Sequence, residues 1–254
     1  MKLLQELIRS KLAGGGGGGE AVLIQKTITA NGTFAAADDN ADGFSSVTAD
    51  VPGGLPKEVP DGYTQLKYVE STGTQIVNTG VTPTLDTKIE IQFYIMPGGS
   101  GYPYPTGCAN PSIGVAVGSG TGGGGYCSFG NVGDKPLGSP PAGGDAPIYT
   151  VSKDEAAGRT SPGLPVVSVA LNATALGNVN PATRIGIFGR YNGNTPERFA
   201  FMRLFREKIW DGDTLLCEFV PAMENATEEV GLYDIVNGVF HRNAGTGVLV
   251  GGAR

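Results

Sequence analysis

The stretch that decides the fold class lies near the C-terminal end of the chain and reads Val230-Gly231-Leu232-Tyr233-Asp234-Ile235-Val236-Asn237-Gly238-Val239-Phe240. Apolar residues stand on both sides of the Asn-Gly pair. Asn and Gly tolerate the positive φ that a tight hairpin needs, and the flanking residues favour extended backbone. The stretch therefore predicts two short strands joined by an Asn-Gly turn, which is typical of a β-rich protein.

Composition agrees with a chain of many turns and little long helix. The 254 residues include 42 Gly and 17 Pro, and only 17% are charged. Glycine and proline disfavour helix interiors, whereas both are common in turns. The 40% apolar content is enough for one domain of roughly 150 to 200 residues with its own core. The net charge of −6 repels phosphate backbones, so a nucleic-acid partner is not expected.

Short strands separated by Gly, Asn and Pro turns fill the segment 62–254, which predicts a β-sandwich there. Apolar residues lie on both faces of 198–210, so that segment is expected to be a central strand. The interval 97–165 is dominated by Gly, Pro, Ser and Tyr, and it predicts long loops around two of these strands. The strand candidates are 88–96, 112–117, 126–129, 166–171, 184–188, 198–210, 215–220, 230–235 and 248–250.

The N-terminal quarter reads as a series of smaller parts. Apolar residues at spacings of three and four predict a short amphipathic helix over 1–13, which is too short to be stable alone and must dock on something. That partner is either its own domain or a larger assembly, and the apolar residues are Leu3, Leu4, Leu7, Ile8 and Leu12. The following parts are a glycine-rich tether at 14–25, a small two-stranded β module at 26–52 and a Gly/Pro linker at 53–61.

A family resemblance rests on two of these stretches. The C-terminal run continues to Gly252, and 73–81 reads Gly-Thr-Gln-Ile-Val-Asn-Thr-Gly-Val after the strand-like 63–71. Together they resemble the laminin-G or concanavalin-like domains attached to structural proteins of bacteriophages and prophages. The segment 26–52 resembles a short β module of tail-associated phage proteins. The resemblance covers roughly 66–93 and 185–252, and it implies a concanavalin-like antiparallel sandwich, or jelly roll, whose first and closing strands are these stretches.

The resemblance also implies a function. It indicates a non-enzymatic virion structural protein, assembled in the host cytoplasm and displayed on the particle surface as a fibre or receptor-binding protein that attaches to host-surface glycans. Its expected partners are capsid or tail proteins, bound through the N-terminal helix, and further copies of itself, for example in a trimer. The alternatives are a capsid decoration or head-fibre protein without a ligand, and a glycan-degrading enzyme.

Aromatic residues near polar groups are the candidate ligand-binding positions. Sugar sites place aromatic faces against C–H faces and add a few fixed polar groups. One group lies in the Gly/Pro-rich interval and the other in a separate polar turn. The alternative is that the tyrosines cover a loop core or a subunit interface. The residues are Tyr102, Tyr104 and Tyr126, and Tyr191, Asn192 and Asn194.

No motif predicts a metal or a cofactor. The three cysteines form no CxxC pair, and their odd number argues against a disulfide scaffold. The segment 38–43 matches the start of an EF-hand loop, but Ala49 stands where the bidentate Glu is required. The segment 118–123 satisfies GxGxxG without a helix pattern after it, so it is not a phosphate cradle.

Catalytic signals are equally sparse. His241 is the single histidine, and no GxSxG elbow accompanies it. A glycosidase could use two carboxylates, for which Glu90, Glu218 and Glu224 are candidates by residue type alone. They form no acidic motif on a single strand, so the chain is not expected to be an enzyme. No stretch approaches the ~18 apolar residues of a membrane span, and no membrane insertion is expected.

Overall fold

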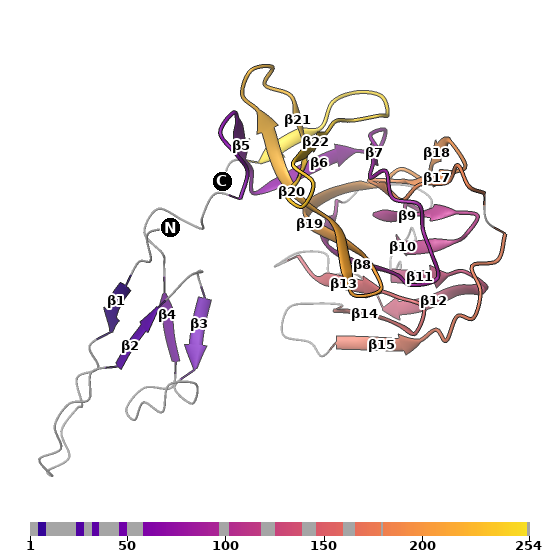
Figure 1. Cartoon of the computed structure of the whole chain (residues 1–254), viewed down its shortest axis with the longest axis horizontal. Coiled ribbons are helices and arrows are strands. Elements are labelled where there is room, and N and C mark those ends of the chain that lie inside the picture. Colours follow the sequence, from indigo (N-terminus) through magenta and orange to yellow (C-terminus); the bar gives the residue numbers. More distant parts are fainter. Residues whose placement is uncertain are drawn as a thin grey trace, which may run out of the picture. The chain divides into compact units, whose positions relative to one another are not determined.

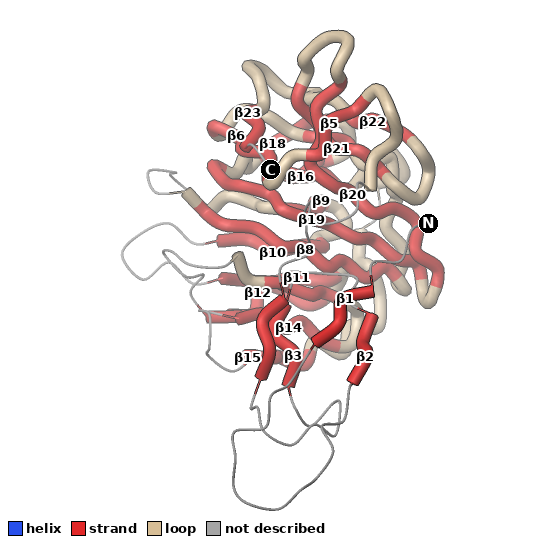
Figure 2. The backbone as a smooth tube through the Cα atoms, turned by 90° about the vertical axis from the view of Figure 1, so that its left-hand side faces the viewer, coloured by secondary structure: helices blue, strands red, loops and turns tan. Residues whose placement is uncertain are grey.

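The structure is a computed structural model of the whole chain. It describes residues 58–252 apart from 97–101, 118–124, 139–145, 160–165 and 179. From 1–57 it describes only the backbone of four strands. The chain divides into two compact units, 1–57 and 58–254, each of which is considered by itself. All the regular structure in the described residues is β-strand (Figure 2).

Two small antiparallel sheets make up the described part of the N-terminal unit (Figure 1). Strand β1 (Gln5–Ile8) pairs with β2 (Ile24–Thr27), and β3 (Gly32–Ala35) pairs with β4 (Ser46–Ala49). The helix predicted over 1–13 is not confirmed, because its central residues are the strand β1. A helix this short gains little from its own hydrogen bonds, whereas a paired strand satisfies its backbone groups across the ladder.

The other residues of the predicted helix and the glycine tether lie outside the described residues. Of the predicted anchoring positions, Leu7 and Ile8 lie in β1, and Leu3, Leu4 and Leu12 are not described. Their role in anchoring therefore stays a prediction.

The C-terminal unit contains two sheets, antiparallel apart from one pairing of β17 with β9, and it is a β-sandwich as predicted (Figure 1). The smaller sheet runs in the order β12-β11-β10-β9-β16-β7, with β17 and β18 attached. Its strands are β7 (Val77–Asn78), β9 (Thr106–Ala109), β10 (Ile113–Val117), β11 (Gly125–Phe129), β12 (Val132–Gly138), β16 (Gly186–Ile187), β17 (Arg190–Asn192) and β18 (Thr195–Glu197).

The larger sheet runs in the order β15-β14-β13-β8-β19-β20-β21-β22, with β5, β6 and β23 attached. Strand β19 is central, as predicted, because it pairs with β8, β20 and β6. The strands are β5 (Tyr63–Gln65), β6 (Tyr68–Thr72), β8 (Thr87–Ile95), β13 (Ile148–Val151), β14 (Glu155–Arg159), β15 (Val166–Ala170), β19 (Phe201–Asp211), β20 (Thr214–Glu224), β21 (Val230–Asp234), β22 (Val239–His241) and β23 (Val250–Gly252).

Alternating side chains from both sheets form the core. On β8 the inward set is Ile89, Ile91 and Phe93, all fully buried. They belong to one cluster with Val115 on β10 and Phe129 on β11 of the other sheet. Because strand side chains alternate between faces, the outer faces of both sheets carry the residues in between. The outer faces are therefore where a ligand can be contacted.

The predicted long loops at 97–165 are wrong for much of that interval. Strands β9, β12, β13 and β14 lie within it, in addition to the two strands expected there. Every residue of β9 is buried although its sequence is only Thr-Gly-Cys-Ala. Small residues fit where strands approach closely, so this strand shows neither alternation nor bulky apolar residues. In this segment the glycine and the other small residues indicate closely packed strands and not a loop.

The predicted C-terminal hairpin is confirmed. Strands β21 and β22 pair around the Asn-Gly turn, where Gly238 has φ +70°. The buried Asp234 carboxylate accepts hydrogen bonds from the backbone N–H groups of Val236 at 3.0 Å and Asn237 at 3.3 Å, and from the Asn237 side chain. The turn is therefore fixed by an Asx-type network as well as by its glycine.

The two stretches that carry the family resemblance contact each other. Gln75 is 1% exposed, and its Oε1 accepts hydrogen bonds from the N–H groups of Thr72 at 2.8 Å and Thr74 at 3.2 Å. Its Nε2 donates to the Val248 carbonyl at 3.1 Å. The Ile76 N–H donates to Asn243 Oδ1 at 3.1 Å. The polar residues Gln75 and Asn243 of these stretches thus join two distant parts of the chain, and they are structural.

A carboxyl group lies inside the sandwich. Glu207 on β19 is fully buried, and its Oε1 accepts a hydrogen bond from Thr106 Oγ1 of the opposite sheet at 2.7 Å. Its Oε2 is the one buried side-chain oxygen or nitrogen in the described residues that has no hydrogen-bond partner. Burial raises the pKa of Glu207 well above its ordinary value, and the Thr106 hydrogen bond opposes this in part. Glu207 therefore keeps its proton to a higher pH in the folded protein than in the unfolded chain.

The buried proton makes stability depend on pH. The folded state binds this proton more tightly than the unfolded state, so stability is greatest below the ordinary carboxyl pKa and falls as pH rises toward the raised value. We expect Glu207 to contribute a slope of up to about 1.4 kcal/mol of unfolding free energy per pH unit. In denaturant titrations from pH 4 upward, Glu207→Gln is expected to remove this slope, whereas Glu155→Gln at an exposed position should keep it. An unchanged slope in Glu207→Gln would contradict the assignment.

Candidate functional site

The outer face of the smaller sheet carries a pair of tyrosines. On β11, Cys127 and Phe129 point into the core, so Tyr126 and Ser128 lie on the outer face. Tyr102 lies beside Tyr126 with ring centroids 6.3 Å apart and planes tilted by 60°. The Tyr102 side chain is 53% exposed. Two aromatic rings are therefore available at the surface, in an arrangement that could contact the apolar face of a sugar.

Tyr104 lies between β11 and the β17–β18 hairpin, where it interacts with Ser128 and Arg190. It is 5% exposed, and the Arg190 guanidinium lies 4.4 Å from its ring centroid. Arg190 also forms a 2.6 Å ion pair with Glu197. Burial raises the pKa of Tyr104, whereas the charge of Arg190 and the hydrogen bonds with Ser128 and Arg190 act against the rise. Tyr104 is therefore a packing residue that links β11 to the β17–β18 hairpin.

The second predicted group lies on that hairpin. Tyr191 is 6% exposed, so its ring packs inside. Asn192 is exposed, and its Oδ1 accepts a 2.9 Å hydrogen bond from Asn110 Nδ2. Asn194 is exposed as well. Because β17 pairs with β9, the structure brings both groups to the same sheet.

Of the four predicted tyrosines, Tyr102 is exposed and Tyr126 is partly exposed, whereas Tyr104 and Tyr191 are buried. Sequence reasoning missed Arg190, which joins the two groups. The signal was weak, because Arg190 stands next to Tyr191 and seven residues before its ion-pair partner, a spacing that indicates nothing until the hairpin is known.

A close approach of two glycines positions the neighbouring strands. Gly107 on β9 and Gly114 on β10 are direct register partners, with φ +145° and +147°. A Cβ added to Gly114 would overlap the carbonyl oxygen of Thr106 and would lie 2.7 Å from the Gly107 Cα. Only glycine fits both the conformation and the space. The two strands under the tyrosine face therefore pack closer than side chains would allow.

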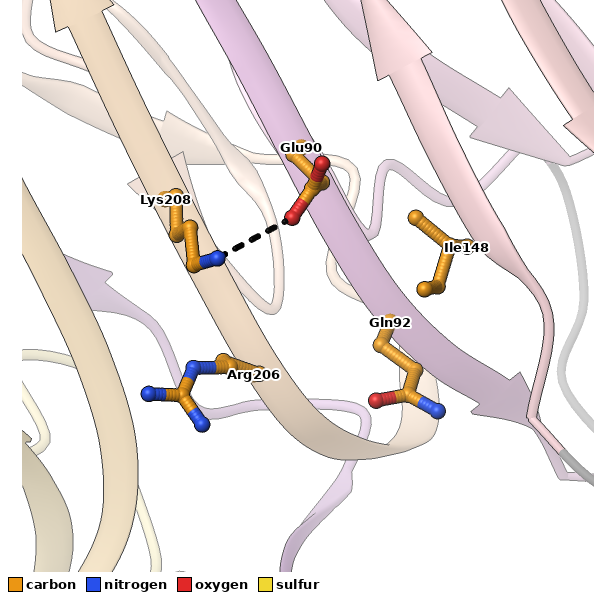
Figure 3. A pocket seen from close by; sticks show the side chains of 5 residues that line it. All are labelled: Glu90, Gln92, Ile148, Arg206 and Lys208. Carbon is orange, nitrogen blue, oxygen red and sulfur yellow. Dashed lines mark ion pairs between the residues drawn. The ribbon is translucent and has the colours of Figure 1, made fainter. Parts of the chain in front are cut away.

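A second candidate lies on the outer face of the larger sheet. A shallow hollow of about 310 Å³ is lined by Glu90, Gln92, Ile148, Arg206 and Lys208 (Figure 3). Figure 3 shows Glu90 and Lys208 reaching toward each other from the neighbouring strands β8 and β19. The Lys208 Nζ lies 3.5 Å from Glu90 Oε1 and 3.7 Å from Glu218 Oε1 on β20. The fold thus brings two of the three candidate carboxylates to one surface.

These carboxylates are already engaged with cations. Arg206 Nε donates to Glu218 Oε1 at 2.6 Å, and its other nitrogens lie 3.3 Å from Glu58. A hydrolase of this type needs one carboxyl that donates a proton and a second that acts as a base or nucleophile. Both Glu90 and Glu218 instead share one ammonium. The two carboxylates are therefore part of a charge-paired surface, and nothing in their surroundings makes one a proton donor and the other a base or nucleophile.

The third candidate, Glu224, lies apart from that hollow. It pairs with Arg242 at 2.6 Å and accepts a hydrogen bond from Thr227 Oγ1 at 2.7 Å. These hydrogen bonds, that of Thr227 first, lower the pKa of Glu224. It therefore fixes the turn between β20 and β21. His241 is likewise structural, with Nδ1 3.0 Å from the Asn78 carbonyl oxygen and its ring edge-on to Phe219.

The cysteines are free and buried. Burial raises the pKa of Cys108 and of Cys127 to about 12 and raises that of Cys217 as well, so all three are thiols at neutral pH. Within the described ranges, no three His, Cys, Asp or Glu side chains cluster as a metal site would require. The segments 38–43 and 118–123, excluded above as calcium and nucleotide sites, lie outside the described residues.

Comparison with known proteins adds no family. The chain matches no family model and no curated protein. The part of the chain that the structure describes also contains no helix long and apolar enough to cross a membrane. Function must therefore be inferred from the geometry of the sandwich and from the sequence resemblance.

Proposed function

We propose that the chain is a non-enzymatic structural protein of a bacteriophage or prophage virion, displayed on the particle surface as a fibre or receptor-binding protein. Its C-terminal unit is a concanavalin-like sandwich that attaches to host-surface glycans. The smaller sheet supplies the binding surface through its outer tyrosine face, defined by Tyr102 and Tyr126. No metal or cofactor takes part.

The observation that carries this proposal is the exposed tyrosine pair. Ring faces contribute apolar area at a low cost in side-chain entropy, and they suit the C–H faces of sugar rings. Tyr102 is more than half exposed, and its neighbour Tyr126 stands on a strand that is anchored by Cys127 and Phe129 in the core. An exposed aromatic ring beside a rigid strand suits a recognition surface, because the strand fixes the position of the binding residues.

Many copies on one particle make weak sites sufficient. A shallow surface binds a single sugar weakly, but repeated copies raise the effective concentration of sites against a repetitive cell-surface polymer. In this proposal the N-terminal unit attaches the chain to a capsid or tail protein, and the sandwich faces outward. The resemblance of 26–52 to a tail-associated module supports this division.

The proposal predicts a specific loss of binding. In co-sedimentation of the protein with purified host cell envelopes, Tyr102→Ala is expected to weaken binding about fivefold or more. The stacking of a nucleic-acid base on an aromatic side chain contributes about 1 to 3 kcal/mol, and we expect a similar contribution for a sugar face. Its midpoint of thermal unfolding should stay within about 2 °C of the parent, because exposed positions contribute little to stability. Soluble envelope glycan should compete with binding.

Trp210→Ala is the matched control. Trp210 lies on β19, on the outer face of the larger sheet beside Lys88 and Lys208, so its removal deletes an aromatic ring on the other side of the sandwich. It should leave envelope binding unchanged. If Tyr102→Ala binds as well as the parent, or if Trp210→Ala alone loses binding, the tyrosine face is not the binding surface.

The enzyme alternative has its own test. Glu90 and Glu218 meet at Lys208, so a glycan-degrading activity would depend on them. We expect no release of reducing sugar from envelope glycans by the parent protein. Release that disappears in both Glu90→Gln and Glu218→Gln would make the chain a hydrolase and overturn the proposal. A protein that binds no envelope at all would fit a decoration or head-fibre role.

A further inference from the structure

One strand edge of the larger sheet is left open and carries no charge. Strand β15 has the sequence Val-Val-Ser-Val-Ala and pairs with β14 along one side, while no described strand pairs with its other side. Val166 is 53% exposed and Val167 is 38% exposed. Because neighbouring residues of a strand point to opposite faces, apolar side chains are exposed on both faces of this edge. Such an edge is a template for pairing with another strand.

Two other sheet edges, at β12 and β22, are protected in the usual ways. Strand β12, at the end of the smaller sheet, carries Asp134, Lys135 and Pro136 at exposed positions. Charge and proline on an edge strand oppose pairing with another chain. Strand β22 ends the larger sheet on the opposite side and has only three residues, Val239 to His241. The unprotected edge at β15 is therefore a local feature of this strand.

We propose that β15 pairs antiparallel with β15 of a second copy of this chain, so that the larger sheets of two copies form one continuous sheet. A two-fold axis at Ser168 sets Val167 opposite Val169 of the partner subunit and Val166 opposite Ala170 of the partner subunit. No like charges meet in this register, because the strand has none. An isologous contact of this kind closes at two copies and forms no open fibre.

The charges on the next strand favour this direction of pairing. On β14, Arg159 is the register partner of Val166, and Glu155 is the register partner of Ala170. Register partners on neighbouring strands form a row across the sheet. In the antiparallel contact, the row that holds Arg159 continues into the row that holds Glu155 of the partner subunit. A parallel, in-register contact would place rows of the same sign end to end. Arg159 then lies about 14 Å from Glu155 of the partner subunit, which is three strand spacings away. Salt screens an attraction over this distance, so the rows give a second copy in antiparallel orientation only a small preference over a parallel one.

Sedimentation velocity of the full chain over a hundredfold range of concentration tests the inference. Val166 and Ala170 are both exposed and face each other across the proposed contact, whereas Val169 packs against the core. We expect a monomer–dimer equilibrium in the parent protein and a monomer at every concentration in the double variant Val166→Lys, Ala170→Lys. The double variant Val166→Glu, Ala170→Glu should also be monomeric. An equimolar mixture of the two should restore the dimer, because Lys and Glu then face each other across the two-fold axis. Circular dichroism confirms that each variant is folded.

Cysteine cross-linking tests the register. In the proposed register, Ser168 lies on the two-fold axis opposite Ser168 of the partner subunit. Antiparallel partners lie within the Cα separation that a disulfide requires, so Ser168→Cys should form a covalent dimer on mild oxidation. Thr150→Cys, on the interior strand β13, should stay monomeric under the same conditions. A parent protein that is monomeric throughout, a trimer, or a dimer unaffected by the lysine variant would overturn the inference. None of these results depends on glycan binding.

Discussion

Gly114→Ala is expected to destabilise the sandwich more than any other single methyl addition considered for this protein. The residue has φ +147°, a conformation that is essentially restricted to glycine and costs other residues about 1 to 3 kcal/mol. The added Cβ would also overlap the Thr106 carbonyl, which is backbone and cannot rotate away. We expect the free energy of unfolding to fall by roughly 3 kcal/mol or more, which lowers the midpoint by about 6 to 12 °C in a domain of this size.

Gly133→Ala is the control for this prediction. Gly133 lies on β12 of the same sheet, and a Cβ there meets nothing within 4 Å. Differential scanning fluorimetry and urea titration should show this variant within about 0.5 kcal/mol of the parent. Equal midpoints for Gly114→Ala and Gly133→Ala would mean that β9 and β10 do not approach as closely as described. Loss of soluble protein in Gly114→Ala alone is the extreme form of the expected result.

Gln75→Leu should produce the next largest loss. The leucine has a similar volume, so little cavity is created, but the N–H groups of Thr72 and Thr74 and the Val248 carbonyl lose their partner. Each buried polar group left unsatisfied costs about 1 to 3 kcal/mol. We expect the free energy of unfolding to fall by about 3 kcal/mol in total. Because the contact to Val248 joins the C-terminal segment to the loop after β6, we also expect proteases to cut the C-terminal end of the variant sooner than that of the parent.

The matched control is Gln92→Leu. Gln92 is partly exposed on the outer face of β8, and its Nε2 donates a hydrogen bond to the Ala146 carbonyl at 3.2 Å. Urea unfolding followed by Trp210 fluorescence should show a change below about 1 kcal/mol for this variant. Similar losses for the two variants would indicate that Gln75 does not hold the two stretches together.

Local sequence patterns predicted the strands that are rich in β-branched and aromatic residues or that flank a recognisable turn. The C-terminal hairpin followed from one Asn-Gly turn, and β8, β19 and β21 followed from runs of β-branched and aromatic residues. These signals are local, so they are readable without knowing the partner strand. Strand β9 gave no such signal, because its glycine is required by β10, a neighbour that sequence alone does not identify.

Sites assembled from several strands escaped prediction for the same reason. Glu90 and Glu218 are 128 residues apart in the chain, and only the pairing of β8, β19 and β20 brings both to Lys208. Arg190 on β17 likewise meets Tyr104 only because β17 pairs with β9, the strand that follows Tyr104. By contrast, Gln75 and Asp234, in the stretches that carry the family resemblance, proved to hold turns and distant segments together. A motif that identifies a fold need not touch a ligand.

We proposed that this chain is displayed on a virion, and cryo-electron microscopy of that assembled particle is the most direct test of surface recognition by the tyrosine face. We predict density for the sandwich on the outside of a fibre, tail tip or head, with Tyr102 and Tyr126 toward solvent and the N-terminal unit against other virion proteins. Sandwich density with Tyr102 and Tyr126 buried against coat subunits would contradict glycan recognition by this face. It would assign the chain to capsid decoration.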